Sequence, residues 1–345
     1  MTGDVAVGVS GDGSDPIIVV GAGLAGLVAA GALVAAGTDV VVVDEGAEPG
    51  GRLATRRIGP ATLDAGAQFF TVRSARFAAM VDGWRADGLP VREWAHGFLR
   101  AGHVGDGPAA ARPGTDGHAR HAVDAGMSAI ARRLASDLPR GARRPGTRVH
   151  AITPSGDGWR VEVEPGRPLD AAAVVCTPPV PRSLALLAAV AQRVPPAVRQ
   201  LRYEPCIALL AALDAPPAVP APGGVQFTRG PVSWLADNAA KGVSATPAVT
   251  VHASGGWSAD HAADGDEEVV DGLLDLVRPW LGAARPVAAS LERWRHSRPL
   301  ESYPERAVRV PGVPPLVLAG DAFGGAKVEG AALSGLAAAD VLLGT

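Results

Sequence analysis

The sequence of 345 residues contains little cysteine, lysine or tyrosine and carries a net charge of only −3. Its two cysteines, Cys176 and Cys206, both lie in apolar surroundings, so we expect reduced thiols and a cytoplasmic protein. Lysine occurs only at positions 241 and 327, and arginine supplies almost all of the positive charge, which we interpret as a coding bias. The small net charge gives no reason to expect nucleic acid or an anionic membrane as partner. No apolar run reaches the length of a membrane-spanning helix.

The first 15 residues have no positively charged segment followed by an apolar one, so we expect a flexible tail and not a signal peptide. The histidines outside the apolar segments show no spacing typical of metal ligands, and we expect them at the surface. They are His96, His103, His118, His121 and His261. The sequence therefore predicts no metal site, and it does not indicate an oligomeric state.

A strand, a glycine-rich turn and a helix follow one another near the N-terminus. Residues 17–20 are apolar and β-branched, which is typical of a buried parallel strand. Gly21, Gly23 and Gly26 have the G-x-G-x-x-G spacing, and residues 27–36 are mostly good helix formers. These glycines would allow a tight turn, close approach of a pyrophosphate, and close packing of the helix on the sheet. The N-terminus of the helix would attract the diphosphate.

A second strand over residues 39–43 ends at Asp44, eighteen positions after Gly26. A carboxylate at this place can accept hydrogen bonds from a ribose. The complete unit predicts a dinucleotide site, and the alternative is a βαβ unit without a ligand. The predicted contacts are Gly21, Ala22, Gly23, Leu24, Ala25, Gly26, Asp44 and Glu45.

Residues 45–52 read Glu-Gly-Ala-Glu-Pro-Gly-Gly-Arg, and with this segment the chain resembles the FAD-dependent amine oxidase superfamily. The resemblance implies that Gly51 and Arg52 surround the pyrophosphate of FAD, a role that suits the planar guanidinium. The alternative is an exposed turn with a solvated arginine. A second resemblance, to the renalase-like branch, starts with Asp64-Ala65-Gly66-Ala67-Gln68. It implies that Gly66, Ala67 and Gln68 lie along the flavin edge, which a hairpin with a buried pair of phenylalanines would also allow.

The C-terminal segment carries a second FAD signature of the superfamily. An apolar strand over residues 315–319 leads into Gly320 and Asp321, and a glycine-rich turn precedes a helix that we expect to begin near Gly330. The carboxylate of Asp321 can hold ribityl hydroxyls, and the helix N-terminus can stabilise negative charge on the flavin. No cysteine lies near this motif, so we expect non-covalent FAD. Further contacts, in part implied by the resemblance, are Val149, Thr177, Gly320, Asp321, Val328 and Ala331.

The order of the segments predicts an α/β fold in which two domains interleave. A Rossmann-like FAD-binding domain, of the p-hydroxybenzoate hydroxylase and amine oxidase type, is expected over residues 16–74, 120–180 and 300–345. An antiparallel sheet with helices on one side is expected over residues 75–119 and 181–299. Further helices are predicted over residues 74–87, 127–138, 181–192 and 267–281. Further strands are predicted over residues 147–152, 159–163, 171–175, 206–213, 249–253 and 286–294, whereas residues 89–117 are too irregular to assign.

The resemblance to renalases extends over residues 16–343 and includes the segments around Tyr203, Ser233 and Trp294. It implies oxidation of the 2- and 6-dihydro isomers of NAD(P)H to NAD(P)+, with O2 reduced to hydrogen peroxide. Removing a hydride from a dihydropyridine restores an aromatic ring, so no general base is needed, only a flat slot and groups that orient the carboxamide. Candidate slot residues are Gln68, Trp234, Asn238, Trp294, Arg295 and His296, although each tryptophan could equally belong to the core.

Two other classes of function remain open. The same FAD motifs would serve an oxidase or dehydrogenase of an amine or a porphyrinogen-like substrate. With only Tyr203 and Tyr303, however, the chain can hardly supply the pair of tyrosines with which the amine oxidases it resembles enclose their substrate. The chain could also be a non-catalytic FAD-binding protein.

Overall fold

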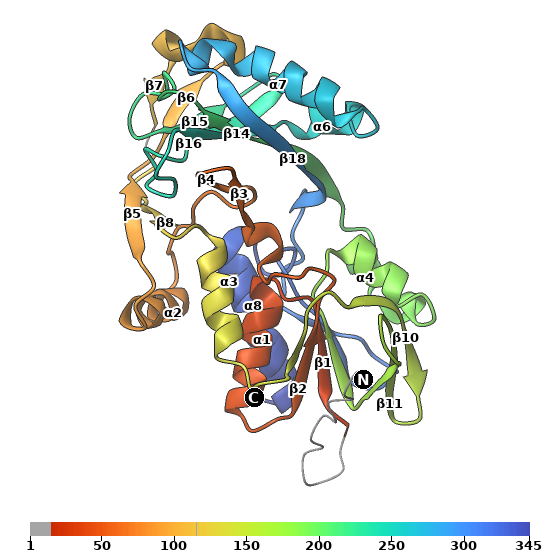
Figure 1. Ribbon diagram of the computed structural model, residues 1–345. Coiled ribbons are helices and arrows are strands. Elements are labelled where there is room, and N and C mark those ends of the chain that lie inside the picture. Colours follow the sequence, from red (N-terminus) through yellow and green to blue (C-terminus); the bar gives the residue numbers. More distant parts are fainter. Residues whose placement is uncertain (1–14, 115) are drawn as a thin grey trace, which may run out of the picture.

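The computed structural model describes residues 15–114 and 116–345, so the predicted tail lies almost entirely outside the described residues. Two large sheets, each covered by helices, form the molecule, and the chain passes between them several times (Figure 1). This agrees with the predicted α/β class.

The first sheet contains the predicted dinucleotide-binding strands in the order β19-β20-β13-β1-β2-β9. The central strand β1 pairs in parallel with β2 and β13, and β13 pairs in parallel with β20. These strands are β1 (Ile17–Val20), β2 (Val40–Val43), β9 (Arg143–Arg144), β13 (Ala173–Cys176), β19 (Val308–Arg309) and β20 (Leu316–Leu318). Strands from both ends of the chain therefore belong to one sheet, with β13 between β1 and β20, and the carboxyl ends of these parallel strands lie at one edge of the sheet.

Both faces of this sheet are covered, as its uninterrupted apolar strands require. Alternate strand residues such as Val19 and Val42 pack against three helices, α1 (Leu24–Ala35), α3 (Ser128–Ser136) and α8 (Lys327–Leu343). Ile18 and Val20 point to the opposite face. That face is covered by α4 (Val180–Leu186), α5 (Pro196–Arg199) and a small sheet of β10 (Arg148–Ser155), β11 (Gly158–Glu164) and β12 (Leu169–Ala171).

The second sheet has the order β18-β14-β17-β16-β15-β6-β7. Its strands are β6 (Leu99–Ala101), β7 (Arg112–Pro113), β14 (Tyr203–Leu213), β15 (Gly224–Phe227), β16 (Val232–Asp237), β17 (Ala248–Ala253) and β18 (Pro286–Pro299). The helices α6 (Gly255–Asp260) and α7 (Asp266–Leu281) cover one face. The hairpin of β3 (Thr55–Ile58) and β4 (Ala61–Asp64) packs on the other face through Leu63, Leu210 and Ala248.

The segment 89–117, which the sequence leaves unassigned, forms the short strands β5 (Val91–Ala95), β6 and β7 with two 3₁₀ turns, Val104–Asp106 and Pro108–Ala110. β5 pairs with β8 (Arg120–Val123), and β6 pairs with β15. Strands of two to five residues are too short for a recognisable alternation of apolar and polar residues. Helix α2 (Ala75–Ala86) precedes this segment.

Some predicted boundaries were wrong. Helix α1 begins at Leu24, three residues before the predicted start, and α8 begins at Lys327 instead of near Gly330. Helix α4 ends at Leu186, well before the predicted Gln192, and is followed by the 3₁₀ turn Ala191–Arg193 and by the short helix α5, which begins at Pro196. Cys176 and Cys206 are free and buried, as predicted. In the described residues, no helix combines the length and apolar character needed to cross a membrane.

Candidate functional site

A cavity of about 1800 Å³ lies between the two sheets and is partly open to solvent. It begins at the carboxyl ends of β1 and β2, passes the N-termini of α1 and α8, and reaches the face of the second sheet. Pockets for drug-sized ligands are typically about 300–1,000 Å³. The cavity therefore has room for a large cofactor together with a substrate.

Most residues predicted to bind FAD or substrate come together in the lining of this cavity. They are Gly21, Gly23, Leu24, Ala25, Asp44, Glu45, Gly51, Arg52, Gly66, Ala67, Gln68, Val149, Thr177, Trp234, Trp294, Arg295, His296, Gly320, Asp321, Val328 and Ala331. Ala22, Gly26 and Asn238 are not part of the lining.

Asn238 corrects the predicted set of substrate contacts. Its side chain is fully buried, donates a hydrogen bond of 2.9 Å to Thr250 Oγ1, and accepts one of 3.3 Å from the backbone N–H of Asp64. The residue thus ties the second sheet to the segment that precedes Gln68. The side chain that we expected to orient the substrate thus makes internal hydrogen bonds instead.

The glycine-rich turn after β1 has the geometry that the spacing predicts. Gly21 has φ +104°, and a Cβ on Gly26 would lie 1.9 Å from the carbonyl oxygen of Gly21. A side chain at Gly26 would therefore separate α1 from the turn, and one at Gly21 would be strained and would lie 2.5 Å from Thr177 Oγ1. Thr177 closes the turn from β13, since its Oγ1 donates a hydrogen bond of 2.7 Å to the carbonyl oxygen of Val20. A Cβ on Gly23 would meet no atom within 4 Å, so this glycine borders open space.

Asp44 organises the same turn from the end of β2. Its Oδ2 accepts a hydrogen bond of 2.6 Å from the N–H of Ala22, and its Oδ1 accepts one of 2.7 Å from the N–H of Gly46. Burial raises the pKa of this carboxyl, and the two backbone hydrogen bonds act in the opposite direction. Asp44 thus shapes the loop, and its remaining acceptor capacity is available to a ribose.

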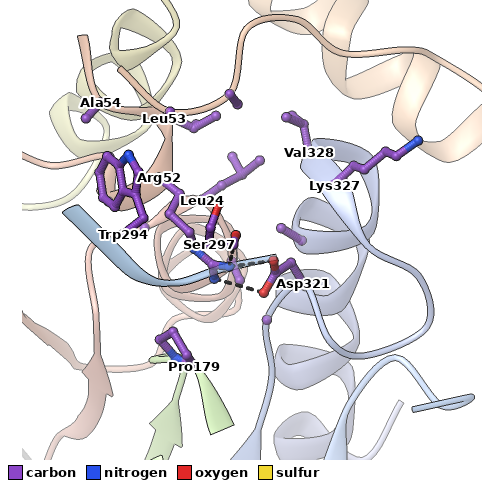
Figure 2. Close-up of a pocket in the computed structure, with 18 of the residues that line it drawn as sticks. Leu24, Arg52, Leu53, Ala54, Pro179, Trp294, Ser297, Asp321, Lys327 and Val328 are labelled. Carbon is purple, nitrogen blue, oxygen red and sulfur yellow. Dashed lines mark hydrogen bonds and ion pairs between the residues drawn. The ribbon is translucent and has the colours of Figure 1, made fainter. Parts of the chain in front are cut away.

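Arg52 and Asp321, which the sequence assigns to different parts of FAD, contact each other across the cavity (Figure 2). Arg52 Nη1 and Nη2 lie 2.6 and 2.8 Å from the two carboxylate oxygens of Asp321. Nη1 also donates a hydrogen bond of 3.1 Å to the carbonyl oxygen of Ser297. One contact thereby joins the N-terminal motif, the C-terminal motif and β18.

A buried polar network lies behind the predicted flavin-edge segment. Asp64 Oδ2 is 2.7 Å from Lys241 Nζ, and both side chains are fully buried. Lys241 also lies 3.4 Å from Gln68 Oε1, while Gln68 Nε2 donates to the carbonyl oxygens of Asp64 and Gly66 at 2.6 and 3.1 Å. The side-chain amide of Gln68 is thus used to fix its own loop, although Gln68 lines the cavity.

Two side chains of the second sheet bind the backbone carbonyl of Ala65, which lies between Asp64 and Gly66 in this loop. His252 Nε2 and Trp294 Nε1 lie 3.1 and 3.3 Å from the carbonyl oxygen of Ala65. Burial lowers the pKa of His252 to about 4, so the imidazole is neutral at pH 7 and donates from Nε2. Sequence reasoning missed Lys241 and His252 as site residues. The sequence offered only two signals for these residues. Lysine is rare in the chain, and His252 lies within the predicted strand 249–253.

The five histidines that we expected at the surface do not gather at one place. His96 and His118 are exposed, and His103, His121 and His261 are partly buried. Within residues 15–114 and 116–345, no three His, Cys, Asp or Glu side chains are arranged to hold a metal ion.

The residues of the cavity fit FAD. The first turns of α1 and α8 both line it, and the N-cap residues Gly23 and Ala326 make no side-chain cap. Their free N–H groups and helix dipoles favour a ligand with negative charge. Gly66 lets the predicted flavin-edge loop pack against the backbone of Arg52, because a Cβ there would lie 2.1 Å from the carbonyl oxygen of Arg52.

Comparisons with known proteins agree with this geometry. The sequence profile of flavin-containing amine oxidoreductases matches residues 95–343, and that of an NAD(P)-binding Rossmann-like domain matches residues 19–84. A hydroxyneurosporene desaturase of Rubrivivax gelatinosus is 47% identical over 57 residues. That stretch covers 16% of this chain and only 11% of the desaturase.

Three solved structures show the same fold at low sequence identity. A candidate protoporphyrinogen oxidase from Exiguobacterium sp. 255-15 has a TM-score of 0.73 and 16% identity, over 97% of this chain and 100% of that one. Putrescine oxidase bound to putrescine has a TM-score of 0.67 and 16% identity, over 96% of this chain and 99% of that one. Cyclohexylamine oxidase from Brevibacterium oxydans IH-35A has a TM-score of 0.69 and 15% identity, over 95% of this chain and 98% of that one. Because the first profile covers more than half of the sequence, the chain belongs to the family of flavin-containing amine oxidoreductases and is an FAD-dependent oxidoreductase.

Proposed function

We propose that this oxidoreductase oxidises the 2- and 6-dihydro isomers of NAD(P)H to NAD(P)+, with O2 as the final electron acceptor. The chemistry that bound FAD supplies is acceptance of a hydride and its delivery to O2, which gives hydrogen peroxide. The whole-chain resemblance to renalases supports this substrate, and the composition of the cavity wall supports it independently.

The observation that carries the proposal is the charge and aromatic content of the lining. Neither Tyr203 nor Tyr303 lines the cavity, so the chain's two tyrosines cannot enclose an amine there. The aromatic wall consists of Phe69, Phe70, Trp234 and Trp294. A flat, mostly uncharged ring matches such a wall better than an aliphatic ammonium group does.

Arginines without an acidic partner also favour a nucleotide substrate over an amine. Arg57, Arg100, Arg295 and Arg306 line the cavity, and among the described residues none of them has a carboxylate partner. A cationic lining repels a protonated amine and attracts a phosphate-bearing substrate. The phosphates of a dihydropyridine nucleotide satisfy this requirement.

The wall also fits a reaction without a general base. Asp321 is paired with Arg52, and a hydrogen bond from Arg120 lowers the pKa of Asp116 to about 2. These two carboxylates of the lining are thus each bound to an arginine, and Asp116 is a poor proton acceptor at neutral pH. Hydride removal from a dihydropyridine creates an aromatic cation and releases no proton, so the residues need only orient the ring and limit access of water.

A second candidate is oxidation of an amine or a porphyrinogen-like substrate. It is favoured by the folds of the candidate protoporphyrinogen oxidase and the putrescine oxidase, which this chain shares over nearly its whole length. The arginines of the lining would suit the carboxylates of a porphyrinogen better than they would suit an amine.

Anaerobic stopped-flow mixing tests the proposal. The 2- and 6-dihydro isomers should bleach the flavin absorbance rapidly, whereas benzylamine and putrescine should leave it oxidised. Ordinary 4-dihydro NADH should react about a hundredfold more slowly, because its reacting carbon is displaced by an ångström or more from the productive position. Rapid bleaching by an amine or a porphyrinogen, with no response to either isomer, would select the second candidate. No bleaching by any reductant of these classes would leave a non-catalytic FAD-binding protein.

A further inference from the structure

One row of side chains crosses the cavity-facing side of the second sheet. The register pairs Arg100 on β6 with Gln226 on β15, Gln226 with Trp234 on β16, and Trp234 with His252 on β17. Directly paired residues point to the same face of a sheet. All four residues line the cavity, whereas their neighbours Leu99, Val225, Leu235 and Val251 pack against the helices on the opposite face.

His252 lies at the end of the row next to the predicted flavin-edge loop, and Arg100 lies at the opposite end. His252 binds the carbonyl oxygen of Ala65, in the loop that also carries Gln68. Arg100 lies three strands away, which corresponds to about 14 Å between the backbones at the usual strand spacing. Figure 1 shows β6 and β15 at the side of the sheet opposite to β18, which carries Trp294. Arg100 therefore lies far from Arg52 and the glycine-rich turn, on the side where a substrate would extend away from its reacting ring.

Trp234 supplies an unused donor within this row. Its side chain is 94% buried (6% relative exposure), and its Nε1 has no hydrogen-bond partner in the described part of the chain. A buried N–H without an acceptor costs about 1–3 kcal/mol, so such groups usually serve a ligand or an ordered water. Trp234 lines the cavity, and a polar atom of a bound substrate could accept this hydrogen bond.

Arg100 is a charge without a structural partner. The register places it beside Arg112 on β7, which donates hydrogen bonds to the carbonyl oxygens of Ala109 and Ala111. Like charges on directly paired residues destabilise a sheet. Gly114 makes room for the arginine, because a Cβ there would lie 2.9 Å from both Arg100 Cδ and Nε. The Arg100 side chain is exposed to solvent at the cavity wall, and no carboxylate of the described residues forms an ion pair with it.

We propose that Arg100, Gln226 and Trp234 form an anion subsite that binds the ribose phosphate of the substrate. This inference rests on the proposed function for the identity of the substrate. A pyridine nucleotide has one ribose between its ring and its first phosphate. With the ring near His252 and Trp294, the ribose lies at Trp234 and Gln226, whose donors face polar oxygens, and the phosphate lies at Arg100. The subsite explains how an uncharged reacting ring is selected by a charged group attached to it.

Two ligands that differ only in the phosphate test the subsite. Nicotinamide mononucleotide and nicotinamide riboside are titrated into the oxidised holoprotein, and their Kd values are measured by calorimetry. In the wild type, the mononucleotide should bind about tenfold to a hundredfold more tightly than the riboside, as expected for charge-assisted hydrogen bonds. In Arg100→Met this ratio should fall to about one, with the Kd of the riboside unchanged. Arg100→Lys should restore part of the ratio, because it keeps the charge but not the planar fork.

Arg112→Met is the matched control, since it removes a neighbouring arginine that does not line the cavity. The control should keep the wild-type ratio. A wild-type ratio of one, or a ratio that persists in Arg100→Met, would overturn the subsite. Equally tight binding of inorganic phosphate would overturn its assignment to a nucleotide. If Arg100→Met abolishes the preference while neither dihydro isomer bleaches the flavin, the subsite stands and the proposed oxidase activity fails.

Discussion

Lys241 and Asp64 form an ion pair of 2.7 Å, although neither side chain has exposed surface. Asp64 Oδ1 also accepts hydrogen bonds from Thr55 Oγ1 at 2.6 Å and from the N–H of Met127 at 2.8 Å. Burial lowers the pKa of Lys241, and the negative charge of Asp64 opposes this effect. The pair joins the loop after β16 to β4, the strand that leads into the loop of Gln68, so the placement of that loop against the second sheet depends on it.

The first prediction is that Lys241→Met destabilises the protein by about 3–5 kcal/mol, because it leaves the Asp64 carboxylate buried without a counter-charge. Asp64→Asn in the same chain should recover part of the loss. Urea unfolding at saturating FAD measures both effects. Arg167→Met is the control, since this arginine is exposed, forms no ion pair among the described residues and does not line the cavity, and it should change stability by no more than about 0.5 kcal/mol. Equal stability of Lys241→Met and the control would show that the pair contributes nothing.

The second prediction concerns Arg52 and Asp321. Arg52→Met and Asp321→Asn should each weaken FAD binding about tenfold to a hundredfold, because each removes a charge-assisted hydrogen-bonding group from the cofactor site. If the pair acts as one unit, the double variant should be little worse than either single one. Fluorescence titration of the apoprotein with FAD measures this. Arg160→Met, an exposed arginine outside the cavity, should bind FAD like the wild type. Fully additive losses would mean that Arg52 and Asp321 bind separate parts of FAD.

The local pattern of the sequence was sufficient for the FAD half of the site. The run from Ile17 to Asp44 specifies strand, turn, helix and strand through residues adjacent in the chain, and the second motif does the same around Asp321. What could not be predicted depends on contacts between distant residues. Lys241 meets Asp64 across 177 positions, and no periodicity indicates such a meeting. Asn238 was predicted to line the cavity and does not, whereas His252 was not predicted and does. Both errors have the same origin, since only the register of β16 and β17 decides which side chains face the cavity.

The third prediction is a pH dependence that His252 causes. Its pKa is about 4 in the folded protein, because burial disfavours the imidazolium, and about 6.5 in the unfolded chain. As the pH falls from 6.5 towards 4, the unfolded chain binds a proton that the folded protein does not, so stability decreases. The loss should reach about 2 kcal/mol at pH 5. His252→Gln keeps a donor for the carbonyl oxygen of Ala65 and should lack this part of the loss. Parallel stability curves for the two proteins between pH 7 and pH 5 would refute the assignment.

The last prediction tests the close contact between α1 and α8, whose first turns border the cofactor cavity. A Cβ on Gly335 would lie 2.3 Å from the carbonyl oxygen of Ala25, a backbone atom that cannot rotate away. Gly335→Ala should therefore push the helices apart and cost about 1–3 kcal/mol of stability. Because Ala25 lines the cavity, FAD affinity should fall as well.

Gly31→Ala is the matched control for this change, as Gly31 lies on α1 and a Cβ there would meet no atom within 4 Å. It should stabilise the protein by up to about 1 kcal/mol, because alanine is the better helix former and restricts the unfolded chain. Thermal unfolding and FAD titration of both variants give the comparison. Opposite signs for the two substitutions are expected, since the same added methyl group is accommodated at one glycine and excluded at the other. Two stabilised variants with unchanged FAD affinity would contradict the close contact of the helices.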